Sequence, residues 1–273
     1  MTPVRLIGEA DIGAAMRLKE AANWNQTELD WRNAMRLAPE GCFGIDCDGR
    51  LVATATAVCF GRELAWIGMV LTDPAYRGRG LARCLMQHAL GYLAARGVEW
   101  IKLDATDMGR PLYASLGFVD ESPIERWARP PAPCEGPELG PLTEIPYALD
   151  REACGADRGE LLRLLAPIEA AAGPAGGYAM GRGGSKAAYF GPSVSRSQVE
   201  ARALLQWFLK RHAGETVYWD LLPENDAALE LARESGFAPL RRLSRMALRG
   251  AGGPPRFARH DQFVFGIAGF EYG

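Results

Sequence analysis

The chain lacks the long apolar runs that membrane-spanning and exported proteins carry. No stretch reaches the roughly 18 apolar residues that a bilayer-crossing helix needs. The first ten residues contain Arg5 and Glu9 and have no apolar segment of the kind that precedes a secretory cleavage site. We therefore expect no membrane association and a cytoplasmic location.

An excess of positive charge is also missing. Lys19, Lys102, Lys186 and Lys210 are the only lysines, and the formal net charge is −2. A general nucleic-acid binder carries a basic excess over its surface. The composition therefore argues against nucleic acid as a partner.

The cysteines and histidines lack the spacing of a metal site. The six cysteines form no Cys-x-x-Cys pair, and the three histidines, His88, His212 and His260, are scattered along the chain. We therefore expect neither a zinc site nor another metal cofactor. In a reducing compartment each cysteine stays a thiol and is explained as a small buried hydrophobic residue.

What is present is the composition of a globular protein of two domains. The 273 residues are 48% hydrophobic and 23% charged, and domains average about 150 residues. The segment Arg129–Pro141 is dense in proline and glycine, so it cannot continue a helix or a central strand. It predicts a linker over 129–141 between domains at 1–128 and 142–273.

Apolar periodicity in the first domain predicts alternating helices and strands. The elements are a helix over 11–20, strands over 42–45 and 51–60 joined at Asp48-Gly49, a strand over 64–71, a long helix that ends at Gly97, a strand over 98–103, a short helix over 110–116 and a strand from Phe118. This is an α/β (α+β) pattern, with helices flanking a mixed, mostly antiparallel sheet.

The second domain repeats this order of elements. They are a helix over 157–165, a hairpin over 178–190, a helix over 198–212, a strand over 216–221, a helix over 225–235 and a strand-like stretch over 262–270. Ser115-Leu-Gly-Phe118 and Ser235-Gly-Phe237 end corresponding helices. The recurrence indicates an internal duplication.

The strongest local signal is a glycine-rich turn between the strand that begins at Leu64 and the long helix. Glycines let successive backbone N–H groups point at one spot, and the helix N-terminus adds free donors and a positive dipole end, which suits a diphosphate. Arg77 and Arg79 add positive charge. Neither the P-loop pattern nor the dinucleotide-binding pattern is present. The alternative is a plain strand–helix turn with solvated arginines.

Two motifs around this turn resemble the GNAT N-acyltransferase superfamily. Arg77-Gly-Arg-Gly80-Leu-Ala82 is similar to the Q/R-x-x-G-x-G/A motif of that family, and Leu112-Tyr113-Ala-Ser-Leu-Gly-Phe118 resembles its second motif. The resemblance covers Pro3 to Arg129. Features such as Trp66-Ile-Gly-Met-Val70 further resemble a subgroup of bacterial proteins in which a second GNAT-like domain follows the first.

The second domain departs from the family pattern. After Pro192 it has Ser193-Val-Ser-Arg-Ser-Gln198 in place of the glycine motif. Without that cradle we expect it not to hold a diphosphate in the same way. We interpret it as a degenerate, non-catalytic copy that shapes or covers the substrate site.

The resemblance implies acetyl-CoA or another acyl-CoA as co-substrate. In the family, the strand before the motif splays from its neighbour and pairs with the pantetheine arm, and one N–H polarises the thioester carbonyl. These roles fall on Met69, Val70, Leu71 and Thr72, and we take Leu71 as the residue that supplies the polarising N–H. The implied diphosphate ligands are Arg77, Gly78, Arg79, Gly80, Leu81 and Ala82.

Tyr113 stands where the family has a tyrosine near the thioester sulfur. Its implied role is to protonate or hydrogen-bond the leaving thiolate, and it also contributes to cofactor binding. The alternative is a helix tyrosine that packs on the sheet.

The general base is not evident from the sequence. Some GNAT enzymes have a glutamate eleven residues before the motif, and Trp66 occupies that position here. Asp104 is our first candidate for a catalytic carboxylate, and Asp107, Glu63 and Asp30 are alternatives. Each is otherwise explained as a surface charge or a helix cap.

Several aromatic and amide side chains are candidates for the acceptor site, because the early helices border that pocket in the family. The candidates are Trp24, Asn25, Gln26, Thr27, Trp31 and Trp66. The alternative is a buried tryptophan pair with Asn25 or Thr27 capping a helix, and the sequence does not decide between the two.

These observations predict an acyl-CoA-dependent N-acyltransferase. We expect it to transfer acetyl to a primary amine by direct attack in a ternary complex, as proximity of the two reactants favours. A non-catalytic acyl-CoA-binding sensor is the alternative, because the strand carboxylate is missing. A nucleic-acid binder that uses the Arg-Gly-Arg-Gly turn is a third reading, which the net charge disfavours. The acceptor and homodimer formation stay open.

Overall fold

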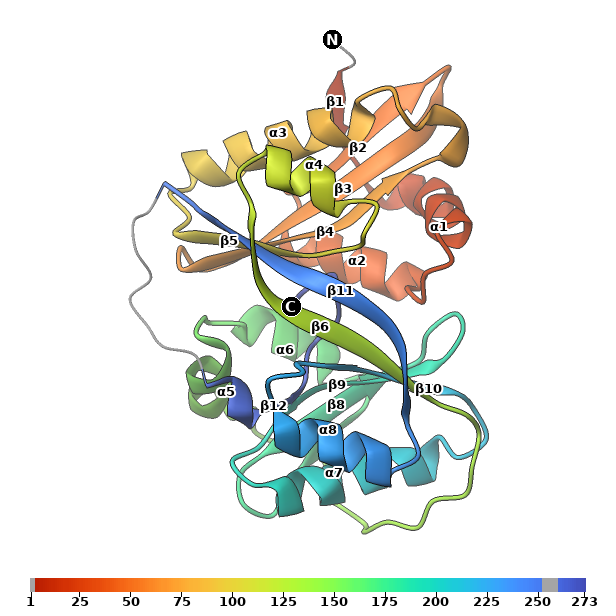
Figure 1. Ribbon diagram of the computed structural model, residues 1–273, viewed down its shortest axis with the longest axis vertical. Coiled ribbons are helices and arrows are strands. Elements are labelled where there is room, and N and C mark those ends of the chain that lie inside the picture. Colours follow the sequence, from red (N-terminus) through yellow and green to blue (C-terminus); the bar gives the residue numbers. More distant parts are fainter. Residues whose placement is uncertain (1–2, 252–259) are drawn as a thin grey trace. The chain divides into compact units, whose positions relative to one another are not determined.

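The computed structural model describes residues 3–251 and 260–273. By its internal contacts the chain divides into two compact units. Among the described residues, unit 1 comprises 3–120, 246–251 and 271–273, and unit 2 comprises 121–245 and 260–270. Each unit has a mixed sheet with helices, which confirms the predicted fold class (Figure 1).

The sheet of unit 1 runs in the order β1-β2-β3-β4-β5. Its strands are β1 (Val4–Leu6), β2 (Cys42–Cys47), β3 (Arg50–Phe60), β4 (Leu64–Thr72) and β5 (Trp100–Ala105). Pairing is antiparallel from β1 through β4 and parallel between β4 and β5. The parallel pair requires a crossover connection, and the long helix supplies it.

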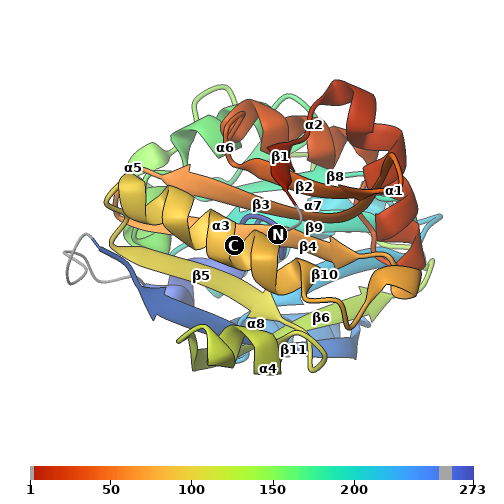
Figure 2. The same ribbon diagram turned by 90° about the horizontal axis from the view of Figure 1, so that it is seen from above.

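Helices cover both faces of this sheet (Figures 1 and 2). They are α1 (Ile12–Ala21) and α2 (Glu28–Leu37) on one face, and α3 (Leu81–Ala95) and α4 (Arg110–Ser115) on the other. Buried residues of α3 pack against Ala53, Ala55 and Ala57 of β3. These small side chains let the helix approach the strand closely, so the start of α3 is held firmly against the sheet.

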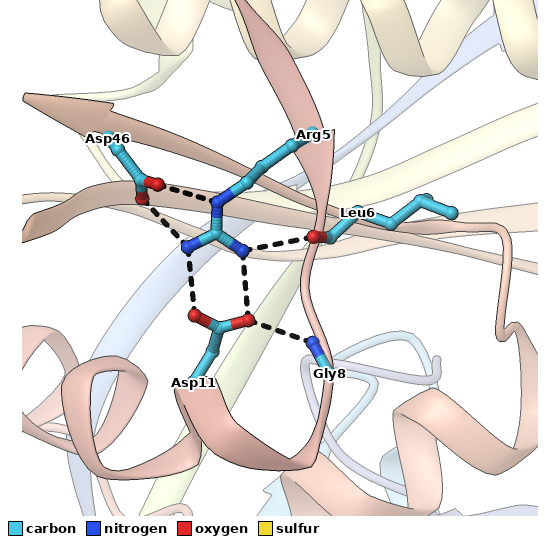
Figure 3. A network of polar contacts seen from close by, with 5 residues as sticks. All are labelled: Arg5, Leu6, Gly8, Asp11 and Asp46. Carbon is cyan, nitrogen blue, oxygen red and sulfur yellow. Dashed lines mark hydrogen bonds and ion pairs between the residues drawn. The ribbon is translucent and has the colours of Figure 1, made fainter. Parts of the chain in front are cut away.

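A charged network joins β1 and β2 to the beginning of α1 (Figure 3). The Arg5 guanidinium donates to both oxygens of Asp46, at 2.6 and 2.8 Å, and to both oxygens of Asp11, at 2.8 and 2.9 Å. Asp11 also accepts from the backbone N–H of Gly8. The Arg5 hydrogen bonds are the main reason that the pKa of Asp11 lies below its ordinary value.

The sheet of unit 2 runs in the order β6-β10-β9-β8-β7, with β12 paired to β9. Its strands are β6 (Val119–Arg129), β7 (Ala170–Ala172), β8 (Tyr178–Arg182), β9 (Ala188–Val194), β10 (Val217–Leu221) and β12 (Val264–Gly266). A further strand, β11 (Ala238–Arg249), has residues in both units. Its helices are α5 (Tyr147–Cys154), α6 (Gly159–Leu165), α7 (Gln198–Arg211) and α8 (Asp226–Glu234). β9 and β10 are parallel, as β4 and β5 are.

Most predicted elements are confirmed within a few residues. β1, α2, α5, β7 and the long strand β11 are not among the predicted elements. The strand-like stretch predicted over 262–270 holds only the three-residue strand β12, because a short 3-10 turn, Asp261–Phe263, precedes it. The hydrophobicity of that stretch reflects burial rather than extended pairing.

The division by contacts differs from the predicted domain boundaries. Residues 130–140 lie outside helices and strands, as a linker requires. However, residues 121–129 of β6 belong to unit 2, and residues 246–249 of β11 belong to unit 1. The domains at 1–128 and 142–273 therefore stay a prediction about which segments fold independently. In the described part of the chain, no helix is long and apolar enough to cross a membrane.

Candidate active site in unit 1

A left-handed turn connects β4 to α3. Gly78 and Gly80 have φ values of 75° and 78°, a conformation that favours glycine. Gly80 is also the residue that caps α3 at its N-terminus. A Cβ atom built on either glycine meets no other atom within 4 Å. The turn therefore has open space above its backbone, where a ligand can lie.

Backbone N–H groups line this turn. The first backbone hydrogen bond of α3 runs from Cys84 N–H to the Gly80 carbonyl, at 3.0 Å. The N–H groups of residues 81–83 precede that bond, and a helix offers them no internal acceptor. Their dipoles add to the positive end of the helix. The turn and the helix start therefore have the geometry of an anion cradle, at the position that the glycine motif predicts.

The two arginines of the motif are exposed and border the cradle. Arg77 Nε lies 3.4 Å from the carbonyl oxygen of Thr72, and the Arg79 guanidinium stacks over Tyr76 at 4.8 Å. Both contacts are weak and can be exchanged for an anion. The arginines are therefore available to a phosphate ligand.

The parallel strands β4 and β5 pair over part of their length only. Their partners are Leu64 with Trp100, Ala65 with Ile101, and Trp66 with Lys102. Beyond these, Ile67–Thr72 of β4 and Leu103–Ala105 of β5 have no mutual pairing; we call these segments the unpaired ends. They leave an edge of β4 on which an extended chain can add as a strand.

A β-bulge lies at the start of the unpaired end of β4. The pairing with β3 shifts between Thr54 and Thr56, and Met69 has a φ of 49°. The Thr54 hydroxyl donates to the carbonyl of Met69 at 2.8 Å, which stabilises this unusual backbone. A bulge changes the direction of the following backbone groups, and such bulges are common beside active sites.

The direction of the N–H groups changes the role predicted for Leu71. Asp73 N–H, just after β4, donates to the carbonyl of Val52 in β3 at 2.8 Å. N–H directions alternate along a strand, so Leu71 N–H also points toward β3, whereas Thr72 N–H points toward the unpaired edge. Thr72, and not Leu71, is therefore placed to donate to a ligand beside β4.

Tyr113 lies in the buried core formed by α3, α4 and the unpaired ends. It is 8% exposed and packs edge-to-face against Phe118, with ring centroids 6.3 Å apart. Burial raises the pKa of its phenol above the ordinary value. The hydroxyl is protonated near neutral pH, as it is in an ordinary tyrosine, and can act as a proton donor. Its packing also fits the alternative of a core tyrosine, and the two roles are compatible.

The candidate carboxylates differ in their suitability as a base. Asp104 lies on the unpaired end of β5 and is half-buried. Glu63 lies at the opposite end of β4, before Leu64, and Asp107 is exposed in a turn. Asp30 accepts hydrogen bonds from Thr27 N–H and Thr27 Oγ1, at 2.7 and 2.9 Å. Of the four, Asp104 alone lies on an unpaired end.

The predicted acceptor residues divide into two kinds. Thr27 is the N-terminal cap of α2 and is held by Asp30, so the alternative of a helix cap applies to it. Trp31 is fully buried in the core. Asn25 and Gln26 are buried polar residues just before α2, and Trp24 is half-buried. Trp66 is buried on β4, on the strand face away from Ala65 and Ile67 of the α3 core.

The last three residues of the chain lie on that same face of β4, which sequence reasoning missed. A Cβ on Gly68 would be 2.8 Å from the Glu271 carbonyl oxygen, and one on Gly273 would be 2.5 Å from the Trp66 ring. The Tyr272 hydroxyl donates to the Asp30 carbonyl at 2.8 Å. No motif marks this tail, because its partners lie about two hundred residues earlier in the chain.

In unit 2, the chain itself occupies the corresponding position between parallel strands. β9 and β10 stop pairing after Phe190 and Trp219. β12 then pairs with the end of β9, through Val264 with Val194 and Gly266 with Ser193. The Trp219 indole donates to the Phe265 carbonyl at 2.6 Å, and Ile267 N–H donates to the backbone carbonyl of Asp220 in β10 at 3.3 Å. A further strand cannot add there.

The helix that follows β9 is also capped by the chain. Ser197 Oγ accepts from Glu200 N–H at the start of α7. The buried Glu200 carboxylate accepts from Ser195 Oγ and from the N–H groups of Ala175 and Gly177. A carboxylate at this helix start opposes a diphosphate by like charge. Both features support the interpretation of a copy without a cofactor cradle.

The described residues, 3–251 and 260–273, contain no group of three or more histidine, cysteine, aspartate or glutamate side chains arranged to hold a metal ion.

Comparison with family models decides the family. The acetyltransferase (GNAT) family model matches residues 15–118, and an acetyltransferase (GNAT) domain model matches residues 147–265. The chain belongs to the GNAT acetyltransferase family. It is a tandem GNAT protein, as the two motifs and the repeated elements predict, and it is placed among the N-acetyltransferases.

Curated relatives of this GNAT protein act on different molecules. The ribosomal protein bS18-alanine N-acetyltransferase of Salmonella typhimurium is 26% identical over 155 residues, which are 55% of this chain and all of the relative. The mycothiol acetyltransferase of Thermomonospora curvata is 30% identical over 41% of this chain. The glucosamine 6-phosphate N-acetyltransferase of Trypanosoma brucei brucei is 32% identical over 26% of this chain. The matches span 39% and 52% of the latter two relatives.

Solved structures agree on the tandem GNAT fold. A protein from Pyrococcus horikoshii that is assigned as an acetyltransferase has a TM-score of 0.82, with 22% identity over 99% of this chain and 95% of its own. A tandem GNAT protein from the clavulanic acid biosynthesis pathway has a TM-score of 0.60, with 15% identity over 92% of this chain and 99% of its own. At these identities the likeness concerns the fold alone.

Proposed function

We propose that unit 1 binds acetyl-CoA and transfers its acetyl group to a primary amine. The observation that carries this proposal is the combination of two features on one strand. The open glycine turn at Gly78 and Gly80 follows β4 after a short 3-10 turn, and the edge of β4 is unpaired beside β5. A diphosphate at the turn and an extended pantetheine arm along the edge fit these two features together.

The proposed chemistry uses groups on both sides of the unpaired ends. Thr72 N–H donates to the thioester carbonyl and stabilises the negative charge that develops there. The Tyr113 phenol, which is buried and, like any tyrosine, protonated near neutral pH, donates to the leaving thiolate. Holding amine and thioester together supplies the proximity that this direct attack requires. Asp104, on the neighbouring unpaired end, stays a candidate for proton removal.

The proposed acceptor is an amine. The curated relatives act on different molecules, so they do not identify it further. Their names specify an alanine of a ribosomal protein in one case and glucosamine 6-phosphate in another. Both of these relatives are named as N-acetyltransferases. We therefore propose the amine as the recognised group, and not one particular scaffold.

The test is release of CoA thiol with acetyl-CoA and a panel of primary amines. We expect acceptor-dependent release that falls about 100-fold in Tyr113→Phe, which keeps the ring packing and removes the proton donor. Calorimetry with acetyl-CoA separates the two roles predicted for Tyr113, because a loss of rate that exceeds the loss of affinity assigns the hydroxyl to proton transfer. Tight acetyl-CoA binding without release for any amine would instead support a non-catalytic acyl-CoA sensor.

A further inference from the structure

Two buried polar side chains of unit 1 lie together although they are 245 positions apart in the chain. Gln26 Nε2 donates to Glu271 Oε2 at 2.8 Å. The two side chains belong to residues that are 7% and 3% exposed. The other amide atom, Gln26 Oε1, is buried and has no hydrogen-bond partner among the described residues.

This arrangement favours a ligand with several N–H donors. A buried acceptor that lacks a donor costs about 1–3 kcal/mol, so Gln26 Oε1 is stabilised by any donor that reaches it. A carboxylate accepts at both oxygens and carries a negative charge. An ammonium group offers three N–H donors and the opposite charge, and it therefore satisfies both neighbours at once.

The pair lies beside the proposed reaction site. The Glu271 backbone lies over Gly68, which has no side chain. A Cβ built on Gly68 would lie 2.8 Å from the Glu271 carbonyl oxygen and 2.9 Å from its Cα. Gly68 immediately precedes the bulge at Met69 and the unpaired edge of β4. Trp66 lies on the same face of β4, at the position where some GNAT enzymes have a glutamate.

We propose that Gln26 Oε1 and the Glu271 carboxylate bind the protonated amine of the acceptor. This inference rests on the proposed function for the role of the amine as acceptor. Glu271 then takes one proton from the ammonium, and the freed lone pair forms a C–N bond with the thioester carbonyl carbon. The C–S bond breaks, and the sulfur keeps the electron pair. The thiolate sulfur receives a proton from the Tyr113 hydroxyl. The Tyr113 oxygen then takes a second proton from the nitrogen that attacked.

As part of this proposal, we expect the amine to reach the pair when residues 271–273 move. Tyr272 and Gly273 hold Glu271 in place through Asp30 and Trp66. Only three residues, 271–273, make up this part of unit 1. The tail therefore both supplies the carboxylate and covers the site.

Binding of a simple ammonium tests the site without requiring turnover. The probe is n-butylammonium chloride, titrated by calorimetry in the presence of CoA, and the comparison is tetramethylammonium chloride, which has the charge but no N–H. We expect n-butylammonium, and not tetramethylammonium, to bind the unaltered protein. Glu271→Gln should weaken it about 10- to 100-fold, as loss of a hydrogen bond to a charged group predicts. The exposed Glu20 provides the matched control, Glu20→Gln, which should bind like the unaltered protein.

A second variant keeps the test decisive if Glu271→Gln folds poorly. Gln26→Met removes the unpartnered oxygen, together with the Nε2 donor to Glu271, at similar volume and keeps the Glu271 carboxylate. Acetyl-CoA affinity reports the fold of each variant, and we expect it to stay unchanged. Absence of n-butylammonium binding, or equal binding in the unaltered protein and the correctly folded variants, overturns the proposal.

Kinetics separate this proposal from the proposed function. If n-butylammonium binding depends on Glu271 but no amine releases CoA thiol, the ammonium site stands and the acyl-transfer function fails. If CoA release is observed and Glu271→Gln leaves kcat/KM for the amine unchanged, the function stands and the assignment of Glu271 fails.

Discussion

Replacing Gly80 by alanine isolates the contribution of the glycine turn to cofactor binding. Gly80 has φ 78° and ψ 6°, and a Cβ at this position meets no atom within 4 Å. The substitution therefore causes no collision in the free protein. Its cost is the left-handed conformation, about 1–2 kcal/mol for a residue with a Cβ. The methyl group then stands in the space proposed for the diphosphate.

The magnitude follows from the number of hydrogen bonds that the methyl group displaces. A hydrogen bond to a charged group contributes about 1.5–3 kcal/mol, so the loss of one N–H contact to the diphosphate raises the Kd for acetyl-CoA about 10- to 100-fold. Gly80→Glu should weaken binding further, because it adds a like charge to the same space.

Gly91 offers a matched control in the same helix. It is exposed in α3, has no positive φ, and a Cβ there also meets nothing within 4 Å. Gly91→Ala should raise stability by about 1 kcal/mol through helix propensity and leave acetyl-CoA binding unchanged. Calorimetry gives the two Kd values, and urea unfolding gives the two stabilities. Equal Kd values for Gly80→Ala and Gly91→Ala would refute the assignment of the diphosphate to this turn.

Two further predictions concern stability and stoichiometry. Hydrogen bonds from Arg5 lower the pKa of Asp11, so its contribution to stability is present above the unfolded pKa and is lost as the pH falls through the folded pKa. Asp11→Asn should therefore be less stable by about 0.5–1 kcal/mol near neutral pH, with the difference shrinking below about pH 4; urea unfolding over a pH series measures it, and a pH-independent difference contradicts the network. Calorimetry should find one acetyl-CoA per chain, because β12 occupies the position between β9 and β10; two equivalents would show that unit 2 also binds.

Features with local causes could be predicted from the sequence. The turn at Gly78 and Gly80 depends on residues next to one another, so the pattern of glycines after a strand and before a helix specifies it. The hairpin at Asp48-Gly49 has the same kind of cause, and both of its turn residues have positive φ. The repeated element order likewise follows from periodicity within each segment, which is why two related units could be inferred.

Features that depend on contacts between distant segments could not be predicted. The N–H direction that favours Thr72 over Leu71 depends on the register of β4 against β3. The position of β12 depends on where β9 and β10 stop pairing.

By itself the sequence predicted the glycine turn and the resemblance to the GNAT family, because neighbouring residues build the turn and short motifs mark the family. Only the tertiary structure showed that the side-chain carboxylate of Glu271 contacts Gln26 beside β4. The physical reason is that this contact joins residues 245 positions apart, which only the folded sheet brings together. No local sequence pattern predicts a contact over that separation.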